Sequence, residues 1–449
     1  MEALLTGGAP SAWRFPLRRL KLVCSTAASN VDKHSRDTEV PVRLANYTDV
    51  YNNAAVTPEM DLMHATASTA QVNRLSLIAG DTLITKDSET ADDIAVPAFV
   101  PFAMPGVVCG YHLTIVRPGP LMHPRFVYWL FSATPMRAQF EVAAKGLTRV
   151  GLSAEAIENV LLPVPSLDEQ RRIAAFLDHE TARIDELVEE QEHLKGLLAE
   201  RRHATTVAAV NGELLGKPLE PSAVPWLQRH AVVWRPVRVR FVARLGSGHT
   251  PSRSHPEYWQ DCTIPWITTG EVSQIRHDRV EYLTETRERV SELGVQNSAA
   301  AVHPAGTVVL SRTASAGFSA IMGLDMATSQ DFVTWTCGPR LRPRFLLLCL
   351  RAMRPDLLGR LAMGSTHKTI YFPDVESLTI PLPPVDEQDE AVEQAWSRLH
   401  RIDETVDSLD AGVRLLRERR SALITAAVTG QIDVSTWTPP DDWLSPEAA

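Results

Sequence analysis

The sequence predicts an α+β protein in which two regions of mixed α/β structure alternate with two long helices. Its 449 residues are about three times the usual length of one domain, so several domains are expected. A segment of about 50 residues occurs twice, and its apolar residues follow a helical period. The regions of about 150 residues that precede each copy contain short β-branched runs separated by Gly, Pro, Ser and Thr.

Duplication is the most specific feature of the chain. Residues 162–214 and 380–432 align without gaps at an offset of 218 and share 20 identities in 53 positions. The same offset aligns the sequence Arg-Ile-Asp-Glu at 183–186 with its copy at 401–404. Agreement at a fixed offset indicates an internal repeat. The chain is therefore organised as variable, similar, variable and similar segments.

Each similar segment is predicted to form one long helix. Closely spaced prolines at the start of each copy give an extended entry that cannot be helical throughout. Asp-Glu-Gln follows at 168–170 and 386–388, where carboxylates favour the positive end of a helix. Gly212 and Gly430 come just after the last periodic turn, where helices often end. A helix of ~45 residues between these limits would be roughly 65 Å long.

The apolar residues of the second copy recur at steps of three and four, which is typical of a coiled coil. They are Val392, Ala395, Leu399, Ile402, Val406, Leu409, Val413 and Leu416. The first copy is less regular, and Gln191 interrupts its seam. Because the segments are copies, we predict that the two helices pack on each other rather than form unrelated surface helices. The residues expected at the helix contact are Ile184, Val188, Leu198, Ile402, Val406, Leu409 and Leu416.

The variable segments are predicted to contain strands and one main helix each. Residues 306–310 and 332–335 are typical of strands. The helices are expected from Pro124 to Phe140 and from Pro343 to about Met353. Residues 214–233 are interpreted as a proline-rich linker.

The composition is that of an ordinary globular protein, with 44% hydrophobic and 22% charged residues. No run approaches the roughly 18 apolar residues of a membrane span, and residues 1–19 lack the pattern of a signal peptide. The five cysteines are never spaced Cys-x-x-Cys, which argues against a zinc ribbon or a disulfide framework and fits a reducing cytosol. We therefore expect a cytoplasmic protein without a membrane partner.

Charge is unevenly distributed along the chain. The net charge of −9 divides into −1 for 1–161, −5 for 162–215, +5 for 216–380 and −8 for 381–449. Nucleic-acid binding needs a local basic face rather than a basic chain. The variable regions are therefore the candidates for DNA contact, whereas the acidic helices are solvated or face a partner protein.

Motifs for catalysis are missing from the sequence. The segment 246–250 (Gly-Ser-Gly-His-Thr) lacks the Gly-Lys-Ser/Thr ending of a phosphate loop and is interpreted as a turn. No Pro-Pro pair precedes the aromatic residue of an adenine methyltransferase motif, and Pro373-Asp374 lacks the acidic-x-Lys partner of a nuclease. The 14 histidines include no zinc-finger or metalloprotease spacing. The sequence thus favours a binding or scaffold role.

The second variable region contains a distinctive series of short motifs. It begins with Gly-His-Thr-Pro-Ser at 248–252, continues with Tyr-Trp at 258–259 and Ile-Pro-Trp-Ile-Thr-Thr at 264–269, and closes with Gly-Ser-Thr-His-Lys at 364–368. Together with the duplicated helices, these residues resemble the specificity subunit of a Type I restriction-modification system. The resemblance covers nearly the whole chain. The first variable region lacks the Thr-Pro-Ser and Tyr-Trp signature, as expected if each region recognises a different DNA sequence.

The resemblance implies two target-recognition domains, at 1–161 and at 216–380 including the linker, each binding one half of a split site in double-stranded DNA. The segments 162–215 and 381–434 would pack as an antiparallel coiled coil with pseudo-two-fold symmetry, before an irregular tail at 435–449. Two DNA methyltransferase (M) subunits and the restriction-translocase (R) subunits would dock on the chain. It would itself be non-catalytic and hold no cofactor, with S-adenosylmethionine, ATP and Mg on the partner subunits.

Candidate DNA-contacting residues follow from the chemistry of base and phosphate recognition. Arg and Lys suit guanine and phosphate, Asn suits adenine, and Ser and Thr suit phosphate. In polar loops between strand-like runs, or just after Gly146 and Gly364, the candidates are Arg43, Asn46, Tyr47, Thr48, Lys86, Arg149, Thr268, Thr269, Arg312, Ser315, His367 and Lys368.

Other functions stay open on sequence alone. One is the DNA-binding subunit of another bipartite restriction system whose partner fuses methyltransferase and nuclease. A second is a protein-interaction scaffold with coiled-coil arms, and a third is a hydrolase or transferase with an unrecognised site. Neighbouring genes, sequence-specific DNA protection and activity of the isolated chain would separate these alternatives.

Overall fold

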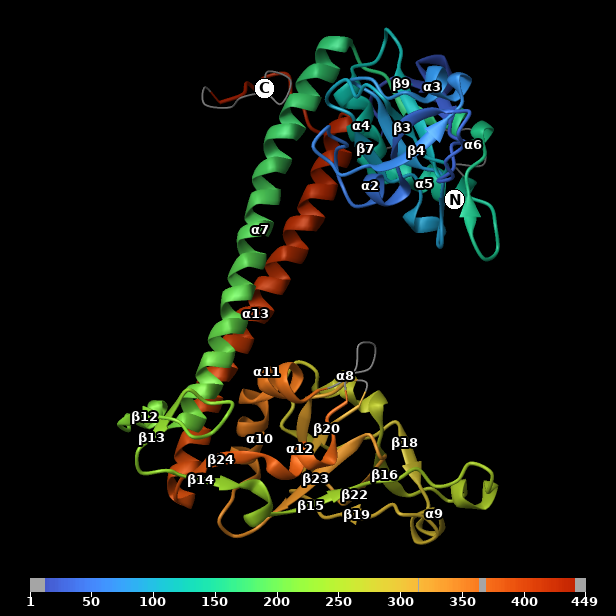
Figure 1. Cartoon of the computed structure of the whole chain (residues 1–449). Coiled ribbons are helices and arrows are strands. Elements are labelled where there is room, and N and C mark those ends of the chain that lie inside the picture. The colour runs from blue at the N-terminus through green and yellow to red at the C-terminus, as the bar shows by residue number, and fades with distance from the viewer. Residues whose placement is uncertain (1–12, 314, 363–368, 441–449) are drawn as a thin grey trace. The chain divides into compact units, whose positions relative to one another are not determined.

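The computed structural model of the chain describes residues 13–313, 315–362 and 369–440. It forms two compact units, which we call unit 1 (1–191 with 411–449) and unit 2 (192–410). Each unit contains one mixed α/β domain and one part of each long helix (Figure 1). Each mixed domain lies where a target-recognition domain was predicted, and we call it the recognition domain of its unit. The predicted α+β class with two long helices is confirmed.

The two long helices are α7 (Leu167–Asn211) and α13 (Val385–Val428). They begin later than the predicted segments because the first proline of each segment lies in a short strand, β11 (Leu161–Pro163) or β24 (Thr379–Leu382), and further prolines follow before the helix. They end just before Gly212 and Gly430, whose φ angles of +92° and +78° suit glycine. At Gly212 a Cβ would also lie only 2.7 Å from the Cβ of Ala231.

Within each unit the long helices pack antiparallel. In unit 1, Leu177 near the start of α7 shares a buried cluster with Ile424 near the end of α13. In unit 2, Val210 at the end of α7 shares a cluster with Val392 at the start of α13. The first helix therefore supplies its start to unit 1 and its end to unit 2, and the second helix does the reverse.

The residues predicted at the helix contact differ in burial. Ile184 and Ile402 are buried, whereas Val188, Leu198, Val406, Leu409 and Leu416 are partly buried. Leu187 and Leu194, which also follow the period of the first copy, are 46% and 41% exposed. Gln191 faces Gly412, where a Cβ would lie 2.8 Å from the glutamine Oε1. The glycine thus makes room for the polar residue that interrupts the seam.

Two matching ion pairs join the repeated motifs. In unit 1, Asp185 of α7 accepts two hydrogen bonds from Arg420 of α13, at 2.8 and 3.1 Å. In unit 2, Arg202 of α7 donates to Asp403 of α13. The offset of 218 maps Asp185 onto Asp403 and Arg202 onto Arg420. Each copy thus supplies the acid of one pair and the base of the other.

Double-mutant cycles should give different coupling energies for the two pairs. The side chains of Arg202 and Asp403 are 17% and 18% exposed, whereas those of Arg420 and Asp185 are 28% and 54% exposed. Water weakens the attraction in the more exposed pair, so we expect about 1–2 kcal/mol for Arg202–Asp403 and below about 1 kcal/mol for Asp185–Arg420. Urea unfolding of the single and double alanine variants measures both. Equal coupling energies would contradict the dependence on exposure.

A buried glutamine fastens each recognition domain to its helix in the same way. Gln170, fully buried, accepts a hydrogen bond from the His123 amide at 2.7 Å and donates to the carbonyls of Leu121 and Pro165 at 3.0 Å. Gln388, which is also fully buried, makes the same contacts in unit 2. It accepts a hydrogen bond from the Arg342 backbone amide at 2.7 Å and donates to the carbonyls of Arg340 and Pro383 at 2.8 and 2.9 Å. The last residue of the repeated Asp-Glu-Gln motif is therefore a structural connector.

Unit 2 has a second connection, centred on Asp278. Its backbone carbonyl accepts hydrogen bonds from Arg202 of α7 at 2.9 Å and from Arg351 at 2.7 Å. Its carboxylate accepts two from Arg354, at 2.7 and 2.5 Å, and lies 3.4 Å from Nε of Arg351. Asp278 has a φ of +58°, a left-handed conformation that Asp tolerates better than most residues. In unit 1, Asp178 of α7 accepts instead from Arg125 and Trp129.

The recognition domain of unit 1 is built on two small sheets. The four-stranded sheet has the order β2-β9-β5-β7 and the three-stranded sheet the order β4-β3-β8, while β1 pairs with β11 and β6 with β10. The strands are β1 (Leu17–Arg19), β2 (Cys24–Ala28), β3 (Val40–Ala45), β4 (Met63–Ala67), β5 (Thr82–Thr85), β6 (Asp87–Ser88), β7 (Pro97–Phe99), β8 (Val107–Cys109), β9 (Leu113–Pro118) and β10 (Val150–Gly151). The helices are α2 (Tyr47–Tyr51), α3 (Thr69–Leu75), α4 (Pro124–Ser132), α5 (Thr134–Ala143) and α6 (Ala154–Glu158).

The single helix predicted from Pro124 to Phe140 is wrong, because the structure divides it into α4 and α5. Ala133 between them is extended, with φ −82° and ψ 140°. Pro135 has no amide hydrogen to continue the first helix and its ring would clash with the carbonyl of Phe131, whereas it fits the first turn of α5. The break lets Phe131 of α4 stack on Phe140 of α5, with ring centroids 5.5 Å apart, and both are fully buried.

The recognition domain of unit 2 repeats the two-sheet plan with more strands. Its sheets have the orders β15-β23-β20-β21-β17 and β18-β16-β22-β19. The strands are β12 (Leu219–Pro221), β13 (Arg229–Ala231), β14 (Arg235–Arg238), β15 (Ala243–Ser247), β16 (Ile264–Ile267), β17 (Tyr282–Leu283), β18 (Glu288–Val290), β19 (Val302–His303), β20 (Val308–Ser311), β21 (Ser319–Met322), β22 (Met326–Thr328) and β23 (Phe332–Cys337). The helices are α8 (Val272–Ile275), α9 (Glu292–Gln296), α10 (Pro343–Ala352), α11 (Arg354–Asp356) and α12 (Phe372–Ser377).

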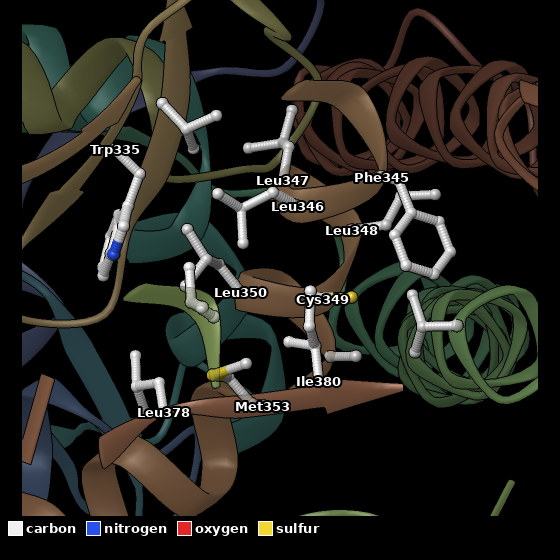
Figure 2. Close-up of a cluster of buried hydrophobic side chains, with 14 of the residues drawn as sticks. Trp335, Phe345, Leu346, Leu347, Leu348, Cys349, Leu350, Met353, Leu378 and Ile380 are labelled. Atoms are coloured by element: carbon white, nitrogen blue, oxygen red, sulfur yellow. The ribbon is translucent and has the colours of Figure 1, made fainter. Parts of the chain in front are cut away.

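Helix α10 forms the centre of the unit 2 core. Figure 2 shows Leu347 and Leu350 of this helix gathered with Trp335 of β23 and Ile380 of β24. All four side chains are at most 1% exposed. The proline-rich segment 214–233 is more ordered than the predicted linker. Its strands β12 and β13 pair antiparallel, and it buries residues such as Val224 in the same core.

Candidate nucleic-acid interface

A groove of about 280 Å³ opens on the recognition domain of unit 1. It lies where the segment before β3, the start of α2 and the turn between β8 and β9 come together. Its lining is mainly aromatic and polar. The lining residues are Val31, Asp32, Lys33, His34, Asn46, Tyr47, Thr48, Tyr111 and His112.

Helix α2 positions three of the predicted DNA-contacting residues in this groove. Asn46 caps the helix, and its backbone N–H donates to Oδ2 of Asp49 at 2.7 Å. Tyr47 follows in the first turn and stacks on Tyr51, with centroids 5.4 Å apart. Burial raises the pKa of the Tyr47 hydroxyl, so this group stays protonated at neutral pH. Thr48 is exposed next to it.

Two predicted cations lie beside the same groove. Lys86 donates from Nζ to the carbonyl of Ser29 at 2.8 Å and lies 4.6 Å from the ring centre of Tyr111. Burial lowers the pKa of Lys86. Arg149 pairs with Asp87 at 2.7 Å, and Asp87 in turn contacts His112 at 2.8 Å. Five of the six candidates of unit 1 thus gather at one place on the domain.

Arg43 is the candidate of unit 1 that the structure places elsewhere. It belongs to β3, and its Nη1 donates to the carbonyl of Pro58 at 3.4 Å. Tyr111 and His112 line the groove but were not predicted. The signal that could have identified them is an aromatic–histidine pair directly after Cys109-Gly110, a strand followed by a turn residue.

The candidates of unit 2 do not form a single groove. Thr268 caps the short helix η6 (Thr269–Glu271), and both its amide and its hydroxyl donate to Glu271 Oε2, at 2.8 and 2.9 Å. Glu271 is fully buried, so Thr268 has a structural role. Thr269 next to it is exposed.

Arg312 and Ser315 lie in the loop after β20. Arg312 donates from Nε to the carbonyl of Gln330 at 3.0 Å, and its guanidinium lies 5.1 Å from the ring centre of Phe372. The carbonyl of Ser315 accepts from the Ser311 hydroxyl at 2.5 Å. His367 and Lys368 lie outside the described residues.

The Gly-His-Thr-Pro-Ser motif lies close to this loop. Thr250 donates to Oε1 of Gln330 at 2.7 Å, and the backbone of Gln330 accepts from Arg312. A Cβ at Gly248 would lie 1.8 Å from the carbonyl of Thr328, so only glycine fits there. Thr250 and Gln330 are therefore polar residues beside Arg312 that the prediction missed.

No cluster of three or more His, Cys, Asp and Glu side chains suited to a metal ion occurs in residues 13–313, 315–362 and 369–440. Within the same ranges, no helix is both long and apolar enough to cross a membrane.

Comparison with known proteins shows which family the second half of the chain resembles. Residues 232–411 match the family model described as Type I restriction modification DNA specificity domain. The specificity subunit of the Type I restriction enzyme MjaIX from Methanocaldococcus jannaschii is 24% identical over 156 residues, which are 34% of this chain and 35% of that protein. The matched part thus spans about a third of the length of that curated relative.

Two solved structures share the fold over nearly the whole chain. One comes from work on complex assembly and conformational transition of the type I R-M system, with a TM-score of 0.66 and 18% identity over 94% of this chain and 99% of that one. The other is the HsdS subunit from Thermoanaerobacter tengcongensis, with a TM-score of 0.51 and 19% identity over 95% and 98%. Residues 232–411 are thus similar to the Type I restriction modification DNA specificity domain, and the chain as a whole shares the fold of these two solved structures.

Proposed function

We propose that this chain is the DNA sequence-recognition subunit of a Type I restriction-modification complex. Each recognition domain binds one half of a split site in double-stranded DNA. The long helices hold the methyltransferase and restriction subunits, and the chain itself is non-catalytic. S-adenosylmethionine, ATP and Mg act on the partner subunits.

The observation that carries this proposal is the repeated connection between domain and helix. Two domains of the same plan are each fastened to the helices by a buried glutamine with matching partners, Gln170 in unit 1 and Gln388 in unit 2. A duplicated support with divergent surfaces suits the recognition of two different half-sites. The family match and the solved type I R-M structure support the same assembly.

The groove of unit 1 has the chemistry that DNA recognition requires. Lys86 and Arg149 supply positive charge for phosphates beside the groove, and Asn46 and Thr48 line it. Phosphate contacts fix the register of a protein on DNA, and amide or hydroxyl groups contact base edges. We assign the recognition of one half-site to this groove.

Modified-base sequencing of host DNA tests the function directly. Genomes from cells with and without the chain are compared while the partner methyltransferase is expressed in both. We expect methyladenine to disappear from one split motif when the chain is removed. An unchanged methylation pattern, in cells whose methyltransferase is active, would refute the proposal.

Charge-removing variants of the groove test its assignment. Lys86→Gln and Arg149→Gln should each weaken DNA binding by the assembled complex and lower the slope of log K against log salt by about one, because each loses one phosphate contact. Fluorescence anisotropy over a salt series measures this slope. Arg19→Gln is the matched control, since Arg19 is exposed and bonds to Asn159 outside the groove. Equal slopes for all three variants would contradict the assignment.

A further inference from the structure

The sheets of the two recognition domains have the same topology, so their elements can be matched. In unit 1, β3 pairs antiparallel with β4 and parallel with β8, and in unit 2, β16 pairs antiparallel with β18 and parallel with β22. The larger sheets contain the matching orders β2-β9-β5 and β15-β23-β20, with antiparallel pairing in both. The elements that form the groove of unit 1 therefore have counterparts in unit 2.

The turn between β8 and β9, which lines that groove, matches the turn between β22 and β23. In unit 1 the backbone amide of Gly110 donates to the last carbonyl of β3 at 2.8 Å. In unit 2 the backbone amide of Ser329 donates to the last carbonyl of β16 at 2.9 Å. Gly110 and Ser329 are thus equivalent, and Gln330 takes the position that Tyr111 has in unit 1.

The residue after β5 matches the residue after β20 in the same way. The backbone amide of Lys86 donates to the carbonyl of His112 at 3.0 Å, and that of Arg312 donates to the carbonyl of Asp331 at 2.8 Å. A lysine beside the groove of unit 1 thus corresponds to an arginine in unit 2. This arginine also holds the matched turn, because its Nε donates to the carbonyl of Gln330 at 3.0 Å.

The helix starts that follow the two central strands match as well. Asn46 caps α2, and its backbone N–H donates to Asp49 at 2.7 Å. Thr268 caps η6, and its backbone N–H donates to Glu271 at 2.8 Å. Each cap thus pairs with an acidic residue three positions later. The turn, the cation and the helix start that border the groove of unit 1 therefore border a matching surface in unit 2.

This surface presents an amide where unit 1 presents an aromatic ring. The side chain of Gln330 is exposed, and its Oε1 accepts a hydrogen bond from the Thr250 hydroxyl at 2.7 Å. That bond uses one lone pair of Oε1, whereas a carboxamide has two lone pairs and two Nε2 hydrogens. Arg312 fixes the backbone of the same residue. Gln330 is therefore an anchored group that can accept and donate at once.

We propose that Gln330 is a specificity-determining residue that reads an A·T pair in the half-site bound by unit 2, and that Thr250 positions it. The inference rests on the proposed function, which supplies the DNA. In the major groove, Nε2 donates to N7 of adenine while Oε1 accepts from its N6 amino group. Guanine presents two acceptors at the same edge, so its O6 would meet Oε1 without a hydrogen between them.

Removal of the amide should relax one position of the DNA motif. The full chain carrying Gln330→Ala is expressed with the methyltransferase partner, and the methylated motif is read by modified-base sequencing. We expect one A·T position in one half of the motif to accept other base pairs, with discrimination there reduced roughly ten-fold or more. The other half, bound by unit 1, should be unchanged. Competition binding with duplexes altered at each position in turn measures the same ratio on the assembled complex.

Two further variants separate base reading from a structural effect. Thr250→Val removes the hydroxyl that anchors Gln330 and keeps the size of the side chain, so it should relax the same motif position by a smaller factor. Gln228→Ala is the matched control, since Gln228 is exposed between β12 and β13 in a segment outside the matched elements. This control should leave every position of the motif as it is in the wild type.

Three results would overturn this inference. The first is an unchanged motif and unchanged discrimination in the Gln330→Ala complex. The second is relaxation at a G·C pair, which would contradict the adenine assignment. The third is an equal loss of affinity for all duplexes, which would make Gln330 a backbone-binding residue. All three leave the proposed function standing, whereas absence of a split motif for the wild-type chain would refute that function itself.

Discussion

Asp278→Asn is expected to lower the free energy of unfolding of unit 2 by roughly 3 kcal/mol, because it leaves a buried cation without its carboxylate. Arg351 is 5% exposed, and its Nε lies 3.4 Å from Asp278 Oδ1. Burial lowers the pKa of Arg351 to about 10, which still leaves it charged at neutral pH. Asparagine tolerates the left-handed backbone of this position, so the variant removes the charge without adding strain.

Hydrogen exchange measures this effect where it occurs. Two units need not unfold together, so a single melting temperature would mix their stabilities. Exchange of the α10 amides reports the opening of unit 2 alone. Asp407→Asn is the matched control, since Asp407 is 61% exposed beside Arg279 and its loss should cost below about 1 kcal/mol. Equal losses for the two variants would show that burial of the charge is unimportant here.

Gln388→Leu is expected to destabilise unit 2 by roughly 2–4 kcal/mol. Leucine fills similar space but cannot form these hydrogen bonds. The backbone amide of Arg342 and the carbonyls of Arg340 and Pro383 would each lose a partner. A buried backbone group that loses its hydrogen bond costs about 1–3 kcal/mol. Because the contacts are repeated, Gln170→Leu should cost unit 1 a similar amount, measured by exchange of the α4 amides.

A glutamine on the same helix provides the control for this substitution. Gln394 is only partly buried, and its side chain donates to Glu390 within the helix at 3.3 Å. Gln394→Leu should change stability by less than about 0.5 kcal/mol. If Gln388→Leu behaved like this control, water would be satisfying the backbone groups and the glutamine would not be a connector.

The sequence predicted the architecture well because its strongest signals are local or repeated. A fixed offset and a helical period identify α7 and α13. The segment Asn46 to Thr48 lies at a groove, but it begins helix α2 instead of forming the predicted polar loop. The division at Ala133 was missed because one proline outweighs a continuous apolar pattern. The order in 214–233 was missed because tertiary burial of Val224 organises a segment that is rich in proline.

The candidate site was harder to predict than the fold because residue type does not specify a residue's partners. Arg312 has the chemistry of a DNA-contacting residue, but its Nε bonds to a backbone carbonyl within the domain. Thr268 is likewise a helix cap. Conversely, Tyr111 and His112 lie in a turn that meets the start of α2 at the groove, and the local pattern at Cys109-Gly110 indicates the turn but not this proximity.

The connector glutamines have a consequence for how the chain responds to its surroundings. A primary amide has no charge and does not titrate, so the contacts of Gln170 and Gln388 keep the same strength across pH and ionic strength. The ion pairs between the long helices, Asp185–Arg420 and Arg202–Asp403, are charged contacts and weaken as salt screens them. A rise in ionic strength should therefore loosen the pairing of the two helices while leaving each recognition domain fixed to its helix.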